Sequence, residues 1–227
     1  MRNLERDTLL VLLAIASGSA DSWSYFGLGH TFVANMTGNT VMMGVSVFHL
    51  HQDFVHPLIA LGAYCLGTVA GTLANRRIPK DAQWTRSVSA ALFVEALLLF
   101  AAELAWIVTG RAPGPRGTSI LLACVAVAIG LQSGTMVQLK VPGVVTTYIT
   151  GTWTTLTNGL TLLAARQPGM RDKKRLEERF ELQAAVLGFY FLSAVFTGWA
   201  FRHAEALVGG ISATAVVLAA AYGALRC

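Results

Sequence analysis

Polar residues that interrupt long apolar stretches are the ones most able to do chemistry in this chain. Asp21 ends the apolar run that begins near Thr8. An ionisable side chain at membrane depth is costly and marks a functional site by default, so Asp21 is predicted to bind substrate. The alternative is that Asp21 lies at the membrane interface and caps a broken helix, next to Trp23 and Tyr25.

The second polar interruption is the Thr-Gly-Asn sequence at residues 37–39, which is echoed by Thr-Gly-Thr at residues 150–152. In lipid, a broken helix is tolerated only inside protein or beside a water-filled cavity. We expect the two segments to face each other across a neutral polar site. The alternative is packing of small residues, with Thr hydroxyls bonded to their own backbone. The predicted substrate-binding residues are Asp21, Asn35, Thr37, Gly38, Asn39, Thr150, Gly151 and Thr152.

Two acidic residues lie deep in the apolar stretch 87–109. Glu95 is near its middle, and Glu103 follows eight residues later, about two helical turns away. A carboxylate in lipid must be protonated or paired, which makes Glu95 a candidate for proton coupling. The alternative is a structural hydrogen bond to a neighbouring helix, and the second half offers no acid at an equivalent depth.

Metal binding and enzyme activity have little support. His49, His51, Asp53 and His56 form a local cluster, but Pro57 disfavours the helix that would align them, so we expect an interfacial loop and no metal. The three cysteines show no CxxC spacing. Nucleophile-elbow, phosphate-loop and zinc-protease motifs are also missing, so we expect no cofactor and no enzyme.

The elements that would position these residues are membrane helices. Of 227 residues, 54% are hydrophobic and only 13% are charged, and the mean hydropathy is +0.57. Several stretches approach the roughly 20 residues that a spanning helix needs. They cover residues 8–28, 31–50, 55–75, 87–109, 118–138, 145–165, 183–201 and 206–225. The sequence therefore predicts an all-α integral membrane protein with no soluble domain.

An internal repeat divides the chain into two tandem halves, 8–109 and 118–225, within a single membrane domain 1–227. The Thr-Gly segments match at an offset of 113 residues. The stretch 62–76 matches 188–202 at an offset of 126, with Tyr64 opposite Tyr190. The offset grows by 13 residues, about the size of a basic insert in the second half. Duplication within a hydrophobic chain is typical of transporters and channels.

The charge distribution favours about six crossings over eight. If each Thr-Gly segment is broken or re-entrant, 14 of the 17 Lys and Arg residues fall on the cytoplasmic side. Both termini are then cytoplasmic, and three crossings per half make the halves inverted. Eight full crossings and a seven-crossing hybrid are the alternatives.

The run from Gly18 through Asp21 to Thr37, Asn39 and Thr40 resembles the YoaK-like family of bacterial and fungal integral membrane proteins, a domain of unknown function. The resemblance covers residues 8 to 225. It implies a compact multi-pass protein with about six crossings. It supplies no activity, substrate or site.

These observations predict an inner-membrane transporter that moves a small solute or ion by alternating access. Its predicted partners are the lipid bilayer and that solute. A homodimer is possible. The basic residues behind the net charge of +5 lie in short loops, which is typical of membrane topology. No nucleic acid is therefore expected. The alternatives are a membrane-embedded enzyme and a structural or regulatory membrane subunit.

Overall fold

The computed structural model describes residues 3–48, 54–78, 84–139, 149–164 and 173–225. Six of its helices are long and apolar enough to cross a membrane. They are α1 (Asn3–Gly27), α3 (Val55–Asn75), α4 (Arg86–Val108), α5 (Gly114–Gln138), α7 (Lys173–His203) and α8 (Val208–Leu225). A short 3-10 helix, η1 (Glu205–Leu207), precedes α8. The predicted all-helical membrane fold is confirmed, and the described chain has six candidate membrane-spanning helices.

In the described part of the chain, the two remaining helices are shorter than a full crossing. They are α2 (Met36–Ser46) with 11 residues and α6 (Ile149–Ala164) with 16. At 1.5 Å per residue they extend for about 17 and 24 Å, against about 30 Å of hydrocarbon core. Each begins at a predicted Thr-Gly segment, so the chain interrupts its crossings where the polar residues are.

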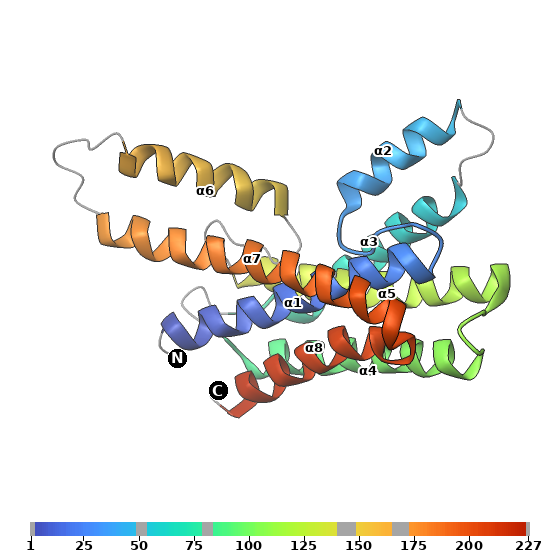
Figure 1. Cartoon of the computed structure of the whole chain (residues 1–227). Helices are drawn as coiled ribbons and strands as arrows, with labels where there is room; N and C mark the ends of the chain where they lie inside the picture. Colours follow the sequence, from blue (N-terminus) through green and yellow to red (C-terminus); the bar gives the residue numbers. More distant parts are fainter. Residues whose placement is uncertain (1–2, 49–53, 79–83, 140–148, 165–172, 226–227) are drawn as a thin grey trace.

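The six long helices run alternately in two directions (Figure 1): α1, α4 and α7 one way, and α3, α5 and α8 the other. Helix α3 packs on α5, α1 packs on α7, and α4 packs on α8. Helix α2 lies against α3, and α6 lies against α7. Both short helices lie on one side of the bundle, away from α4 and α8, and both begin near its centre (Figure 1).

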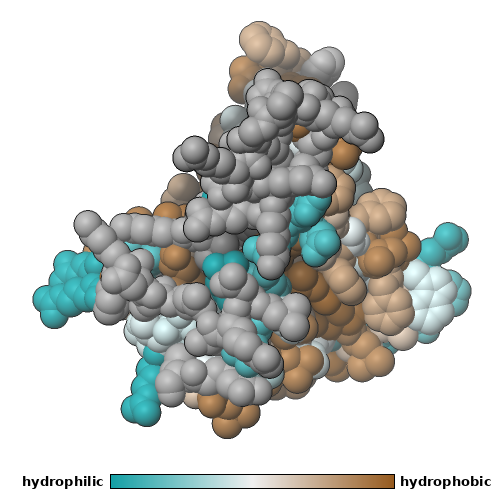
Figure 2. Space-filling model, turned by 90° about the vertical axis from the view of Figure 1, so that its left-hand side faces the viewer, coloured by the Kyte–Doolittle hydropathy of each residue, from teal (hydrophilic) through white to brown (hydrophobic). Residues whose placement is uncertain are grey.

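Helices α1, α4 and α7 begin and α3 and α8 end at one end of the bundle (Figure 1), and five of the described basic residues, Arg6, Arg76, Arg77, Arg86 and Arg179, lie near these helix ends. Hydrophilic side chains surround this end, and the adjoining flank is apolar (Figure 2). We call it the basic end. Its described basic residues with exposed side chains include Arg76, Arg77 and Arg86. At the opposite end an exposed ion pair between Arg111 and Glu205, 3.4 Å apart, connects the turn after α4 with η1.

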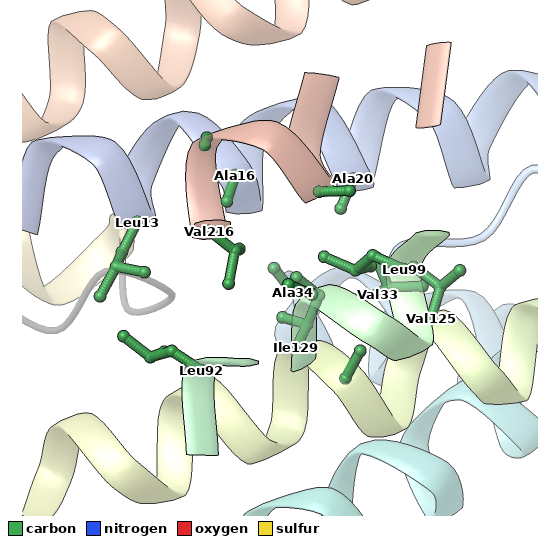
Figure 3. Close-up of a cluster of buried hydrophobic side chains, with 14 of the residues drawn as sticks. Leu13, Ala16, Ala20, Val33, Ala34, Leu92, Leu99, Val125, Ile129 and Val216 are labelled. Carbon is green, nitrogen blue, oxygen red and sulfur yellow. The ribbon is translucent and has the colours of Figure 1, made fainter. Parts of the chain in front are cut away.

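The buried apolar core is formed chiefly by α1, α4, α5 and α8 (Figure 3). Leu13, Leu92, Ile129 and Val216 meet there, one from each helix, and each is fully buried. Val33, from the segment before α2, is inserted among them. Large apolar side chains that point outward from the bundle suit contact with lipid. They include Leu66, Leu97, Phe191 and Leu218.

The closest helix contact joins the two halves of the chain. Gly67 and Gly71 of α3 lie against the backbone of α5, and Gly130 and Gly134 of α5 lie against the backbone of α3. A Cβ atom on any of these four glycines would overlap a carbonyl oxygen of the facing helix. Small residues let membrane helices approach in this way. Gly67 and Gly71, which are four residues apart, therefore pack between the halves.

In the predicted repeat, the contact of α1 with α7 corresponds to the contact of α5 with α3. Some of its glycines are replaced by larger residues. Gly18 still lies against the Tyr190 carbonyl group. Ser22 takes the place corresponding to Gly134, and its hydroxyl donates a 3.0 Å hydrogen bond to the Ala194 carbonyl oxygen of α7. Ser193 takes the place corresponding to Gly67.

Candidate functional site

A cavity of about 400 Å³ lies where α2 and α6 begin. Its volume falls in the range of small-molecule sites. Three of the six long helices, α3, α5 and α7, contribute lining residues, as do both short helices. The lining residues are Ala34, Asn35, Met36, Thr37, Tyr64, Thr68, Ser133, Val137, Ile149, Thr150 and Tyr190. These side chains supply hydroxyl, amide and apolar groups, and none of them carries a formal charge at neutral pH.

The lining contains residues from equivalent positions of the predicted repeat. Thr37 and Thr150, separated by 113 residues, both line the cavity, as do their neighbours Met36 and Ile149. Tyr64 and Tyr190, separated by 126 residues, form another pair. The two halves thus contribute side chains of similar chemistry to one space.

Asp21 lies behind this cavity and organises the chain that enters α2. Its Oδ1 atom accepts hydrogen bonds from the backbone N–H groups of Val33 and Ala34, at 2.8 and 2.6 Å. Its Oδ2 atom accepts a 2.5 Å hydrogen bond from the Tyr190 hydroxyl. Asp21 is 4% exposed, so these bonds replace the water that a buried carboxyl loses. Through Tyr190, one wall of the cavity is bonded to the backbone before α2.

Two asparagines shape the same segment. Asn35 is the N-cap of α2, and its side chain accepts a 3.1 Å hydrogen bond from the Gly38 N–H group. Asn39 is fully buried and pairs with the Phe32 backbone, accepting from its N–H group at 3.0 Å and donating to its carbonyl oxygen at 2.6 Å. The loop therefore folds back on the first turn of α2.

The two acidic residues of α4 lie outside the cavity lining. Glu95 is fully buried between Leu92 and Leu99 on one face of α4. Neither of its carboxyl oxygens has a hydrogen-bond partner among the described residues. The Glu103 carboxyl oxygens also have no hydrogen-bond partner of good geometry among the described residues, but they lie near the backbone N–H groups of Gly209 and Gly210, at the start of α8.

Comparison with known proteins identifies the family of this chain. A profile described as "Protein of unknown function (DUF1275)" matches residues 9–224, nearly the whole chain. The chain belongs to this family. One curated relative is the UPF0700 transmembrane protein YoaK of Bacillus subtilis (strain 168). It is 31% identical over 191 residues, which cover 84% of this chain and 81% of the relative. No solved structure matches.

The predicted resemblance to the YoaK-like family is thus confirmed, as is a multi-pass membrane protein. The predicted site residues of this family member separate into two groups. Three of them line the cavity, namely Asn35, Thr37 and Thr150. The other five lie outside the lining, namely Asp21, Gly38, Asn39, Gly151 and Thr152.

Sequence reasoning missed four polar lining residues: Tyr64, Thr68, Ser133 and Tyr190. The two tyrosines carried a usable signal, because they match in the repeat and an amphipathic side chain inside a membrane segment needs a polar partner. Ser133 also had one, since it takes the position equivalent to Asp21 at the offset of 112 residues that relates Gly130 to Gly18. Thr68 resembles any helix threonine, with its hydroxyl bonded to the Tyr64 carbonyl oxygen.

Of the histidine cluster, residues 49, 51 and 53 lie outside the described part of the chain. The His56 ring lies 3.4 Å from the Ser119 hydroxyl, near the starts of α3 and α5. Within the described residues, no group of three or more His, Cys, Asp or Glu side chains is placed to hold a metal ion.

Proposed function

We propose that this protein moves a small solute or ion across the membrane and binds it in the cavity between the starts of α2 and α6. The observation that carries the proposal is that two short helices begin at one cavity, whose largely apolar lining includes hydroxyl and amide groups from both halves. Discontinuous membrane helices with unwound backbone at a central site are a recurring transporter design. The lining is largely apolar and carries a few hydroxyl and amide groups, which suits a small solute that has both apolar and polar parts.

We further propose that the halves are inverted repeats. Helices at equivalent positions run in opposite directions: α1 against α5, α3 against α7, and α4 against α8. The packing supports the same relation, because α1 on α7 corresponds to α5 on α3, and α2 on α3 corresponds to α6 on α7. When a site lies between inverted halves, equivalent movements of one half against the other can open it toward either side of the membrane.

Within this proposal, Asp21 positions the site through Tyr190 and the backbone of Val33 and Ala34. Glu95 is kept as the candidate for proton coupling, since it is buried and its oxygens lack hydrogen-bond partners in the described chain. Its place on α4 means that protonation would act through the packing of α4 on α5 and α8.

We place the protein in the cell inner membrane, with the basic end and both termini in the cytoplasm. The support is the excess of Lys and Arg at that end. Arg111, Arg116 and Arg202 then face outside.

Cysteine accessibility tests the proposal without knowledge of the substrate. Thr37→Cys and Thr150→Cys are each made in a chain lacking Cys65, Cys124 and Cys227, and vesicles of both orientations are treated with a membrane-impermeant thiol reagent. A transport site must be reachable from water, so we expect modification of both cysteines, with rates that depend on the side of addition. A purely structural subunit has a closed, packed interior, and protection of both cysteines from both sides would overturn the proposal.

Asp21→Asn is the companion variant, assayed for solute-driven currents in proteoliposomes against amino acids, sugars and inorganic ions. An amide donates where Asp21 now accepts, so we expect lost or uncoupled transport in a folded protein. Unchanged, still pH-dependent transport would remove Asp21 from the site.

A further inference from the structure

Helix α6 has a polar face that points away from the helix it packs on. Thr152 and Gly159 are buried, and the Thr155 hydroxyl accepts a 2.9 Å hydrogen bond from Gln183 of α7. At about 100° per residue, five exposed residues fall in an arc of about 100° on the side opposite Thr152 and Gly159. They are Thr150, Thr154, Thr157, Asn158 and Thr161, and we call them the polar face of α6.

The same face of α2 is apolar. At the repeat offset of 113 residues, the positions that follow Thr37 are Val41, Gly44, Val45 and Phe48. All four are exposed, and Phe48 is 86% exposed. Such a surface suits lipid. Two helices in equivalent places therefore present opposite surfaces, so the polarity of α6 is not a general property of the short helices.

The residues on the polar face of α6 differ in the cost of exposing their side chains to lipid. The Thr154 and Thr161 hydroxyls donate to backbone carbonyl oxygens one turn earlier, which satisfies them in any environment. No hydrogen bond to the Asn158 amide or the Thr157 hydroxyl is found in the described chain. Burying an unbonded amide in hydrocarbon costs several kcal/mol. These two residues favour water at this face.

The polar face begins at the cavity. Thr150 belongs to both, and α6 runs from the cavity toward the basic end (Figure 1). Its 16 residues extend for about 24 Å, and half of the hydrocarbon core is only about 15 Å thick. The helix is therefore long enough to connect a central cavity with the membrane surface.

We infer that the polar face of α6 is one wall of a water-filled route that connects the cavity with the basic end, and that a polar solute enters or leaves along it. This inference rests on the proposed function. Helix α2 offers no such wall toward the opposite end, so the two directions of access differ.

Cysteine reactivity along α6 tests the route. Thr154→Cys, Thr157→Cys and Thr161→Cys are made singly in the chain that lacks native cysteines. Leu160→Cys is the control, because Leu160 is 52% exposed on the apolar flank of the same helix. N-ethylmaleimide reacts with thiolates and so needs water. We expect the three polar-face cysteines to react at least ten times faster than Leu160→Cys. An impermeant reagent should reach them from the side of the basic end.

Each result decides something. If the three polar-face cysteines react as slowly as Leu160→Cys while Thr150→Cys reacts, the cavity is open to water by another path and the route is overturned alone. If Thr37→Cys and Thr150→Cys are both protected from both sides as well, the proposed function fails with it. Thermal unfolding of each variant in detergent must match that of the parent, which separates protection from misfolding.

Discussion

The hydroxyl of Tyr190 on α7 donates a 2.5 Å hydrogen bond to the Oδ2 atom of Asp21 on α1. The same carboxyl group accepts from the Val33 and Ala34 N–H groups through its other oxygen. One side chain therefore ties together the two halves of the chain and the entry to α2. Since Tyr190 also lines the cavity, a ligand that moved the tyrosine would act on a bond that holds α2 in place.

Tyr190→Phe should lower the free energy of unfolding by about 1 to 2 kcal/mol, because it leaves one oxygen of a buried carboxyl group without its donor. The control is Tyr64→Phe, at the equivalent position of the repeat. No hydrogen bond from the Tyr64 hydroxyl is found among the described residues, so we expect a change below about 0.5 kcal/mol. Thermal unfolding of purified protein in detergent measures both. Equal losses in the two variants would mean that the bond to Asp21 adds no stability.

Asn39→Ala should destabilise the fold by about 3 kcal/mol, because it removes both hydrogen bonds to the Phe32 backbone and leaves buried polar groups. Asn35→Ala is the milder comparison, since it removes one exposed N-cap bond worth about 1 kcal/mol. Thermal unfolding gives the order of the two losses. A larger effect at Asn35 than at Asn39 would contradict the account of this loop.

Gly67→Ala should cost about 1 to 3 kcal/mol, because the added methyl group overlaps the Val127 carbonyl oxygen and forces α3 and α5 apart. Gly62→Ala is the matched control on the same helix, where nothing lies within 4 Å of the added carbon. Alanine is the better helix former by about 1 kcal/mol, so this control should keep or raise stability. If both variants unfold at the same temperature, backbone contact does not hold the two helices together.

Glu95→Gln should leave stability unchanged or raise it, because the amide has nearly the same shape and cannot ionise in the apolar core, where the carboxyl has no hydrogen-bond partner among the described residues. Glu103→Gln should instead cost about 1 kcal/mol, because it weakens the attraction to the N–H groups that begin α8. Unfolding temperatures of the two variants, measured side by side, check the contrast. A marked loss at Glu95 would indicate a partner for its carboxyl group.

Much of the fold could be predicted from the sequence, because apolar length identifies membrane helices and the positive charges select the crossing number. The Thr-Gly segments were recognisable because polar groups are costly in lipid unless they have hydrogen-bond partners or line a cavity. What each side chain does there was harder to predict. Asn39 and Thr37 are two residues apart, yet one bonds the loop and the other lines the cavity. That division depends on the rotation of α2 against α3, which no local pattern encodes.

Tyr64 and Thr68 were missed for a related reason. Both lie on an apolar helix whose other face is exposed, and the cavity is formed only when α3, α5 and the two short helices meet. Asp21 was noticed as costly, but the backbone groups that satisfy it lie 12 and 13 residues away along an irregular loop. Contacts of that kind come from tertiary structure.

The unequal small-residue contacts bear on which parts of the bundle can move. Four glycines bring the backbones of α3 and α5 together, and sliding of these helices would move carbonyl groups away from the glycines and against residues that carry a Cβ atom. At the corresponding contact of α1 with α7, Ser22 and Ser193 leave the backbones less interlocked. If the protein works by the proposed transport, α3 and α5 would stay together as a fixed frame, while α1 and α7 shift across it and carry Asp21 and Tyr190 with them.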